Sequence, residues 1–208
     1  MKQKINCNWH RYVDLGLPSG LLWATCNVGA KEPWESGLYF SWGNVDGHAK
    51  DSGYDFGTSN DGPYASTPGG KLATDIPVDA RYDAARANLG GSWRMPTTAE
   101  FWELRDNCTN EWTTQNGVNG ERFISRINGN SVFFPATSYF YGTSLNGEGV
   151  CGRYWSSSLH SYTYYSYGFS FGSRYVNPQS YIYPYLGFTV RAVLDHPKDS
   201  LLIKKNHQ

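Results

Sequence analysis

The sequence has no excess of either charge and no long apolar run. Lysine plus arginine and aspartate plus glutamate are equal at 18 each, so the formal net charge is zero. Binding to nucleic acid or to an anionic membrane surface needs a basic excess, so neither partner is expected. No apolar stretch approaches the roughly 20 residues of a membrane span. The N-terminus shows no secretory signal, which leaves open synthesis in the cytoplasm without export.

Closely spaced cysteines are also missing. The four cysteines lie far apart and form no CxxC pair: Cys7, Cys26, Cys108 and Cys151. Zinc sites normally have ligands at short spacing, so no zinc site is expected. We expect buried free thiols, while one or two disulfides remain an alternative if the protein works outside a cell.

Motifs of known catalytic chemistry are absent as well. The sequence has no GxSxG, P-loop, GxGxxG or HExxH motif, and its five histidines are scattered. We therefore predict a protein that is not an enzyme and has no cofactor. The four acids of the Asp46–Asp61 loop make a calcium site an alternative at this point. The ordered ligand pattern of an EF-hand is missing, however, which favours solvated carboxylates and no metal.

What the sequence has is a high aromatic content, 16%, together with 23 glycines. The pattern predicts a loop-rich chain with short strands and few helices. The glycine-rich segment 43–70 is predicted to be a long surface loop. Strands are predicted on both sides of the Leu17–Gly20 turn and at 38–42, 122–127, 131–136, 153–157, 165–171 and 187–194.

Two helices are predicted in the middle of the chain. The alanine-rich segment 79–89 ends at two glycines, which is a typical C-terminal signal. The second helix begins at Thr97, where Thr97 and Glu100 form a capping box. Its residues Phe101, Leu104 and Cys108 share one face and should point inward. Strands, two helices and again strands indicate an α+β protein with a mainly antiparallel sheet. We predict a single domain over residues 1–195, followed by a polar and basic tail at 196–208.

A segment near the C-terminus has an unusual composition. Nine of the sixteen tyrosines lie between Tyr154 and Tyr185, interleaved with eight serines. From Ser156 to Val190 there is no lysine, glutamate, aspartate, methionine or tryptophan, and Arg174 is the only charged residue. Solvated faces are rich in lysine and glutamate, and cores are rich in leucine, isoleucine and valine. Tyrosine, serine and glycine are instead typical of antibody-like binding surfaces. The alternative is a tyrosine-rich but ordinary β-domain.

Strand alternation sorts the residues of this segment. Phe169 and Phe171 should face the core together with Tyr167, whereas Ser166, Gly168 and Ser170 should face outward. Trp155 should be buried, as should four more of the eight tryptophans, at positions 23, 42, 93 and 102. The candidate ligand-binding residues, which we expect to gather largely on one exposed face, are His160, Tyr162, Tyr164, Tyr165, Gly168, Ser170, Ser173, Tyr175, Ser180, Tyr181, Tyr183 and Tyr185.

Four ordered motifs resemble those of the bacterial "major paralogous" (FISUMP-type) domains. They are Tyr-Val-Asp-Leu-Gly-Leu-Pro-Ser-Gly-Leu-Leu-Trp-Ala-Thr at 12–25 with Asn-Val-Gly-Ala at 27–30, Gly-Ser-Trp-Arg-Met-Pro-Thr-Thr-Ala-Glu-Phe at 91–101, Gly-Arg-Tyr-Trp-Ser-Ser at 152–157 and Gly-Phe-Thr-Val-Arg-Ala-Val at 187–193. The likeness covers residues 11–194. It implies a C-type-lectin-like fold related to the formylglycine-generating enzymes, with two helices and a loop-rich, mainly antiparallel sheet.

The resemblance also implies a function. The family includes variable proteins of diversity-generating retroelements, in which mutagenesis at adenines rewrites codons between the last two motifs, here within about 154–193. Such codons never yield lysine, glutamate, glutamine, methionine or tryptophan, and the stretch from Ser156 to Val190 obeys this rule apart from Gln179. We therefore predict a ligand- or receptor-binding protein displayed on a phage particle or bacterial cell surface, with an unknown protein or glycan as its partner.

Two alternatives remain open. The first is a cell-surface carbohydrate-binding module, although the Glu-Pro-Asn and Trp-Asn-Asp motifs of calcium-dependent lectins are absent and Glu32-Pro33-Trp34 does not replace them. The second is an enzyme of the formylglycine-generating type, whose reactive cysteine pair has no evident counterpart in this sequence.

Overall fold

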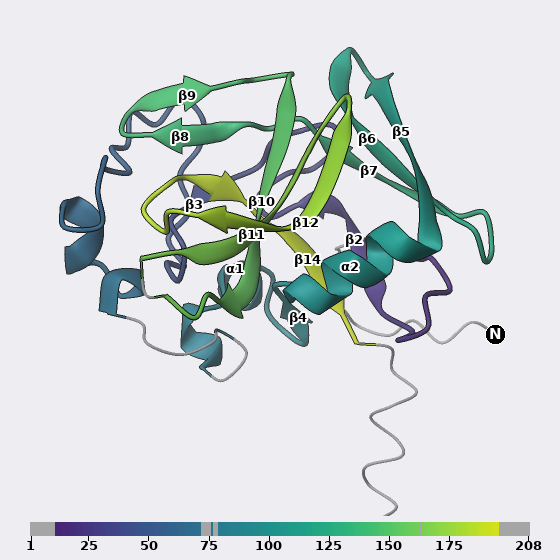
Figure 1. Cartoon of the computed structure of the whole chain (residues 1–208), viewed down its shortest axis with the longest axis horizontal. Helices are drawn as coiled ribbons and strands as arrows, with labels where there is room; N and C mark the ends of the chain where they lie inside the picture. Colours follow the sequence, from purple (N-terminus) through teal and green to yellow (C-terminus); the bar gives the residue numbers. More distant parts are fainter. Residues whose placement is uncertain (1–10, 72–75, 77–78, 163, 196–208) are drawn as a thin grey trace, which may run out of the picture.

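The computed structural model describes residues 11–71, 76, 79–162 and 164–195, and it is a mixed α+β structure (Figure 1). The predicted tail at 196–208 and Cys7 lie outside the described residues. The described part contains two α-helices, α1 (Ala84–Leu89) and α2 (Thr98–Asn107). Its strands are β1 (Tyr12–Asp14), β2 (Leu22–Asn27), β3 (Tyr39–Phe40), β4 (Trp93–Arg94), β5 (Cys108–Gln115), β6 (Val118–Ser125), β7 (Ser131–Pro135), β8 (Tyr139–Tyr141), β9 (Ser144–Asn146), β10 (Cys151–Leu159), β11 (Ser166–Gly172), β12 (Tyr175–Ile182), β13 (Phe188–Thr189) and β14 (Arg191–Leu194).

The strands form four sheets that are mainly antiparallel. The largest has the order β12-β11-β10-β13-β3, in which β10 and β13 pair in parallel. The second has the order β1-β2-β14-β4, the third is β5-β6-β7, and β8 and β9 form a hairpin. The strands β10, β11 and β12, which contain most of the tyrosine-rich segment, are therefore consecutive neighbours in the largest sheet.

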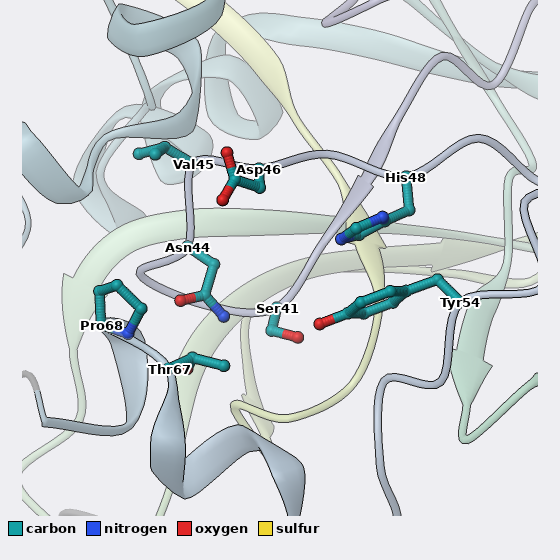
Figure 2. Close-up of a pocket in the computed structure, with 8 residues that line it drawn as sticks. All are labelled: Ser41, Asn44, Val45, Asp46, His48, Tyr54, Thr67 and Pro68. Carbon is teal, nitrogen blue, oxygen red and sulfur yellow. The ribbon is translucent and has the colours of Figure 1, made fainter.

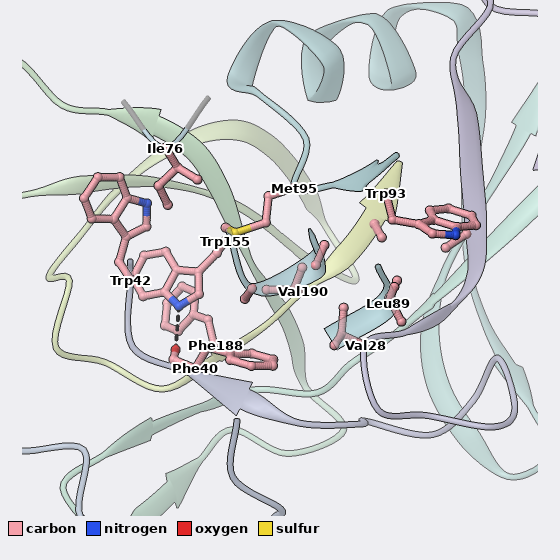
Figure 3. Packing of buried hydrophobic residues seen from close by; sticks show 14 of the residues in the cluster. Val28, Phe40, Trp42, Ile76, Leu89, Trp93, Met95, Trp155, Phe188 and Val190 are labelled. Atoms are coloured by element: carbon pink, nitrogen blue, oxygen red, sulfur yellow. Dashed lines mark hydrogen bonds between the residues drawn. The ribbon is translucent and has the colours of Figure 1, made fainter. Parts of the chain in front are cut away.

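The five-stranded sheet has a hydrophobic cluster on each face. Tyr154 and Phe169 point into one cluster together with Phe101 of α2. Trp155 and Phe188 point into the other, where their rings stack at 4.4 Å and the indole nitrogen of Trp155 donates to the carbonyl oxygen of Phe40 (Figure 3). Because consecutive residues of a strand point to opposite faces, both faces of the central strands are covered.

Helix α2 has the predicted local structure. The Thr97 hydroxyl accepts from the backbone N–H of Glu100, and the Glu100 carboxylate accepts from the backbone N–H of Thr97, so the capping box is present. Phe101, Leu104 and Cys108 are all buried. The helix packs against β12, β11 and β10 and so covers part of one face of the largest sheet.

Three predictions of local structure need correction. The predicted helix at 79–89 is divided, because Asp83 ends a 3-10 turn (Ala80–Tyr82) and caps α1 by accepting from the backbone N–H of Arg86. The strands β4, β5, β8, β9 and β12 were not predicted. The segment 43–70 is largely irregular as expected, but it contains short 3-10 turns at Pro63–Ser66 and Gly69–Lys71.

A fully buried arginine joins three strands. Arg191 of β14 donates to the side-chain oxygen of Asn27 at 2.9 Å and to the backbone oxygens of Ala24, Thr25 and Phe133. Its guanidinium also lies over the ring of Phe134. Burial lowers the pKa of Arg191. The neutral oxygens around this cation fix β14 against β2 and β7, which is a structural role and not a binding role.

Candidate binding surface

Five tyrosines gather around the ring of His160 at one end of β11 and β12. We call this group the tyrosine patch, and it consists of Tyr162, Tyr165, Tyr167, Tyr181 and Tyr183. Tyr167 and Tyr181 are opposite each other in the β11–β12 ladder, with ring centroids 5.7 Å apart. The rings of Tyr165 and Tyr183 lie 5.2 Å apart, and a hydrogen bond with Tyr183 raises the pKa of Tyr165. These pairs bring together residues that are up to 18 positions apart in the sequence.

The tyrosine patch is largely open to solvent. Tyr162 and Tyr181 are 70% and 66% exposed, and Tyr183 is 45% exposed. Tyr165 and Tyr167 are half-buried. Half-burial corrects the prediction for Tyr167, which was expected to lie in the core with Phe169. Exposed aromatic side chains in contact with one another offer a large and rigid apolar area, which is a property of binding surfaces.

His160 lies at the centre of the tyrosine patch, beneath its rings. It is only 6% exposed, and its ring is within 6 Å of the rings of Tyr162, Tyr165, Tyr167 and Tyr181. Its Nδ1 accepts a hydrogen bond of 2.9 Å from the backbone N–H of Tyr162. The burial of His160 therefore argues against the prediction that it contacts a ligand itself. Its ring instead packs against the tyrosine rings and holds them in place.

The small residues of the segment are buried and not outward-facing. Ser166, Gly168 and Ser170 point into the cluster of Trp155 and Phe188, since both faces of β11 are covered. Ser180 is also buried, and its hydroxyl lies 2.5 Å from that of Ser170. The prediction that Ser166, Gly168 and Ser170 face outward is therefore wrong, because it assumed a sheet with one solvated face. Burial of Gly168, Ser170 and Ser180 also removes the reason to count them among the ligand-binding residues.

The remaining candidate residues lie outside the tyrosine patch. Tyr185 is only 6% exposed and stacks on Tyr183 at 5.5 Å, so it supports the edge of the patch. Burial raises the pKa of Tyr185. Tyr164 is exposed, and its backbone oxygen accepts from Asn60. Ser173 and Tyr175 are exposed at the β11–β12 turn. Tyr175 lies six positions, about 20 Å, from Tyr181 along β12. A register shift between them pairs Tyr175 with Gly172 and Tyr181 with Tyr167, which lie on opposite faces of β11, so the candidate tyrosines do not all share one face.

Sequence reasoning missed two exposed aromatic residues near the tyrosine patch. Tyr141 of β8 is 45% exposed and lies 6.2 Å from Tyr185. Trp102 of α2 is 36% exposed, which corrects the prediction that it is buried, and it donates to the side chain of Gln179 in β12. The helical spacing that turns Phe101 and Leu104 inward also turns Trp102 away from the core, so the exposure of Trp102 could have been predicted from the sequence. No sequence signal linked Tyr141 to the segment.

A separate small pocket lies in the loop after β3, with a volume of about 180 Å³ (Figure 2). On one side the rings of His48 and Tyr54 stack at 3.4 Å. Asn44 and Thr67 lie on the other side, and Ser41 lies between them and Tyr54. Burial lowers the pKa of His48, against the opposing effect of the nearby Asp46 carboxylate. The pocket combines an aromatic wall with the neutral hydrogen-bonding groups of Ser41, Asn44 and Thr67 and with the carboxylate of Asp46.

The acidic residues and cysteines of the described part form neither a metal site nor a cysteine pair. In the described ranges, no group of three or more histidine, cysteine, aspartate or glutamate side chains is arranged to hold a metal ion. Asp55 of the candidate calcium loop accepts from the backbone N–H of Gly57. Cys26, Cys108 and Cys151 are free thiols, of which only Cys108 is buried.

Comparisons with known proteins add no relative. No family model, no curated protein and no solved structure matches this chain. Within the part of the chain that the structure describes, no helix has the length and apolar character needed to cross a membrane.

Proposed function

We propose that the tyrosine patch is the ligand-binding surface of a variable protein of the diversity-generating-retroelement type. The observation that supports this best is the ring network of five solvent-accessible tyrosines around His160. Tyrosine gives large contact area at a low cost in side-chain entropy, and it is enriched at binding hot spots. The segment also lacks lysine and acidic residues, which are depleted at the centre of interfaces.

The proposed scaffold is a C-type-lectin-like fold, and the proposed role is selection of a host or partner from a phage particle or a bacterial cell surface. The α+β class with mainly antiparallel sheets is compatible with this scaffold. On such a scaffold the contacts with the ligand come from the exposed residues Tyr162, Tyr164, Tyr181 and Tyr183. Binding, and not catalysis, is the proposed activity.

The DNA that flanks the gene tests the proposed class. We expect a near-copy of the codons for residues 154–193 beside a reverse-transcriptase gene, with differences mainly at adenines. We further expect these differences at the codons of exposed residues such as Tyr162 and Tyr181, and not at those of buried residues such as Phe169 and Trp155. Flanking DNA without such a copy would remove the retroelement class from the proposal.

A carbohydrate-binding module is the second candidate, and the pocket of His48 and Tyr54 favours it. Sugars stack on aromatic faces, and the neutral groups Ser41, Asn44 and Thr67 provide hydrogen bonds of the kind that hydroxyls accept and donate. A glycan array separates the two candidates. Glycan binding that is lost in Tyr54→Ala and kept in Tyr181→Ser would favour the carbohydrate-binding module.

A further inference from the structure

A cleft lies between the β11–β12 turn and the inner face of the β5-β6-β7 sheet. Its volume is about 470 Å³, and it is lined by residues of α2, β5, β6 and the turn, among them Arg105, Trp112, Glu121, Arg174 and Tyr175. The cleft is about 20 Å from Tyr181 along β12. It is therefore separate from the tyrosine patch, and nothing in the proposed function uses it.

Glu121 is the unusual residue of this cleft. Its side chain is 1% exposed and lies opposite Trp112 in the β5–β6 ladder. One carboxylate oxygen, Oε1, accepts from the side-chain amide of Asn110 at 2.8 Å, while Oε2 is buried and has no hydrogen-bond partner. A buried acceptor without a partner is costly, more so when it is charged. Burial also raises the pKa of Glu121. A donor from a ligand would relieve this cost.

The surroundings of Glu121 define the ligand further. Trp112 and Tyr175 are aromatic residues of the cleft, and aromatic faces attract both apolar groups and cations. Arg105 and Arg174 add guanidinium groups. Arg105 already pairs with Asp106 and stacks over Trp102 at 3.9 Å, which leaves Arg174 as the exposed cation of the turn. The cleft thus combines a buried acceptor, aromatic walls and an exposed cation.

We propose that this cleft binds a free α-amino acid with an aromatic or large apolar side chain. The ammonium group donates to Oε2 of Glu121, the carboxylate pairs with Arg174, and the side chain packs against Trp112 and Tyr175. An amine alone leaves Arg174 unpaired, and a carboxylic acid alone places a second anion near Glu121. Only a ligand that has both charges complements both Glu121 and Arg174.

Isothermal titration calorimetry with three probes tests the proposal. The probes are L-phenylalanine, L-phenylalaninamide, which keeps the ammonium group and lacks the carboxylate, and N-acetyl-L-phenylalanine, which lacks the ammonium group. We expect L-phenylalanine to bind more tightly than either analogue, since each analogue loses one charge-assisted hydrogen bond. Absence of heat from L-phenylalanine at millimolar concentration, or equal binding of all three probes, would overturn the proposal.

Two variants assign the contacts. Glu121→Gln keeps the shape of the side chain and should weaken binding of L-phenylalanine by about tenfold or more. Arg174→Ala changes an exposed residue that the fold does not need, and it should weaken L-phenylalanine while leaving L-phenylalaninamide unchanged. Unchanged affinity of both variants for L-phenylalanine would contradict the assignment. Tyr181→Ser is the control that separates this site from the tyrosine patch, because it should bind L-phenylalanine as the wild type does.

Discussion

The two halves of β11 present different residues on the same face of the same strand. Phe169 and Phe171 are fully buried, and Phe169 stacks on Phe101 of α2 at 4.5 Å. Tyr167, two residues earlier on this face, is half-buried and contacts the exposed ring of Tyr181. Strand alternation places all three residues on one face. It does not determine which of them another element covers.

This difference shows how one face can serve both stability and binding. Where α2 and the β5-β6-β7 sheet pack against β11, the residues are phenylalanines and the face is core. Beyond this cover the residues are tyrosines, whose hydroxyls tolerate water while their rings still pack together. The covered half should therefore tolerate little change, and the uncovered half should tolerate much.

The largest effect is expected in the covered half. Phe169→Ala removes a fully buried ring and should lower the free energy of unfolding by about 3–5 kcal/mol. Denaturant melts of the variant and the wild type measure this difference. A loss below about 1 kcal/mol would mean that the cluster around Phe169 collapses without cost, and the distinction between the two halves would fail.

A smaller loss is expected at Gly168, on the opposite face of β11. A Cβ atom at this position would lie 3.0 Å from the backbone oxygen of Tyr154 and 3.2 Å from Ile182. Gly168→Ala should therefore lower stability by about 1–3 kcal/mol, as overpacking does. The matched control is Ser173→Ala at the exposed turn, which should leave stability unchanged. Equal melts of the two variants would indicate that Gly168 faces open space.

Glu121 extends these tests to a buried charge. Its folded-state pKa is raised above the unfolded value of about 4.3. Its contribution to stability is thus fully present below about pH 4 and is lost as the pH rises through the folded pKa. The free energy of unfolding of Glu121→Gln, relative to that of the wild type, should therefore rise between pH 4 and pH 7. A constant difference across this range would mean that the folded-state pKa is not raised.

The smallest effects on stability are expected in the tyrosine patch. Tyr162→Ser, Tyr181→Ser and Tyr183→Ser should each change the free energy of unfolding by about 0.5 kcal/mol or less, as for other surface substitutions. Thermal melts of these variants measure the changes, and a melt of Phe169→Ala under the same conditions gives the size of a core defect for comparison. If these variants unfold as readily as Phe169→Ala, the tyrosines belong to the core, and the binding proposal loses its basis.

Local signals predicted part of the fold. The capping box at Thr97 specified the start of α2, and the Leu17–Gly20 turn separated β1 from β2. β12 was missed because Pro178 interrupts it, which is tolerated since β12 is an edge strand. β5 was missed because it is mostly polar. Arg191 was not recognised as buried, because its acceptors come from distant parts of the chain.

The candidate site was predicted in composition but only partly in geometry. The concentration of tyrosine and the lack of charge indicated the segment. Burial of Ser166, Gly168 and Ser170 could not be predicted, because it depends on a second hydrophobic cluster that residues far away in the sequence supply. The position of His160 beneath the tyrosine rings likewise depends on the pairing of β11 with β12.

Selection from two displayed libraries tests the central claim most directly. One library randomises the five residues of the tyrosine patch, and the other randomises five exposed positions elsewhere in the structure: Thr109, Glu111, Thr114, Ile127 and Ser131. Both are selected for binding to the same panel of unrelated folded proteins. The account predicts specific binders from the tyrosine-patch library and few or none from the other. Binders at equal frequency from both libraries would contradict it.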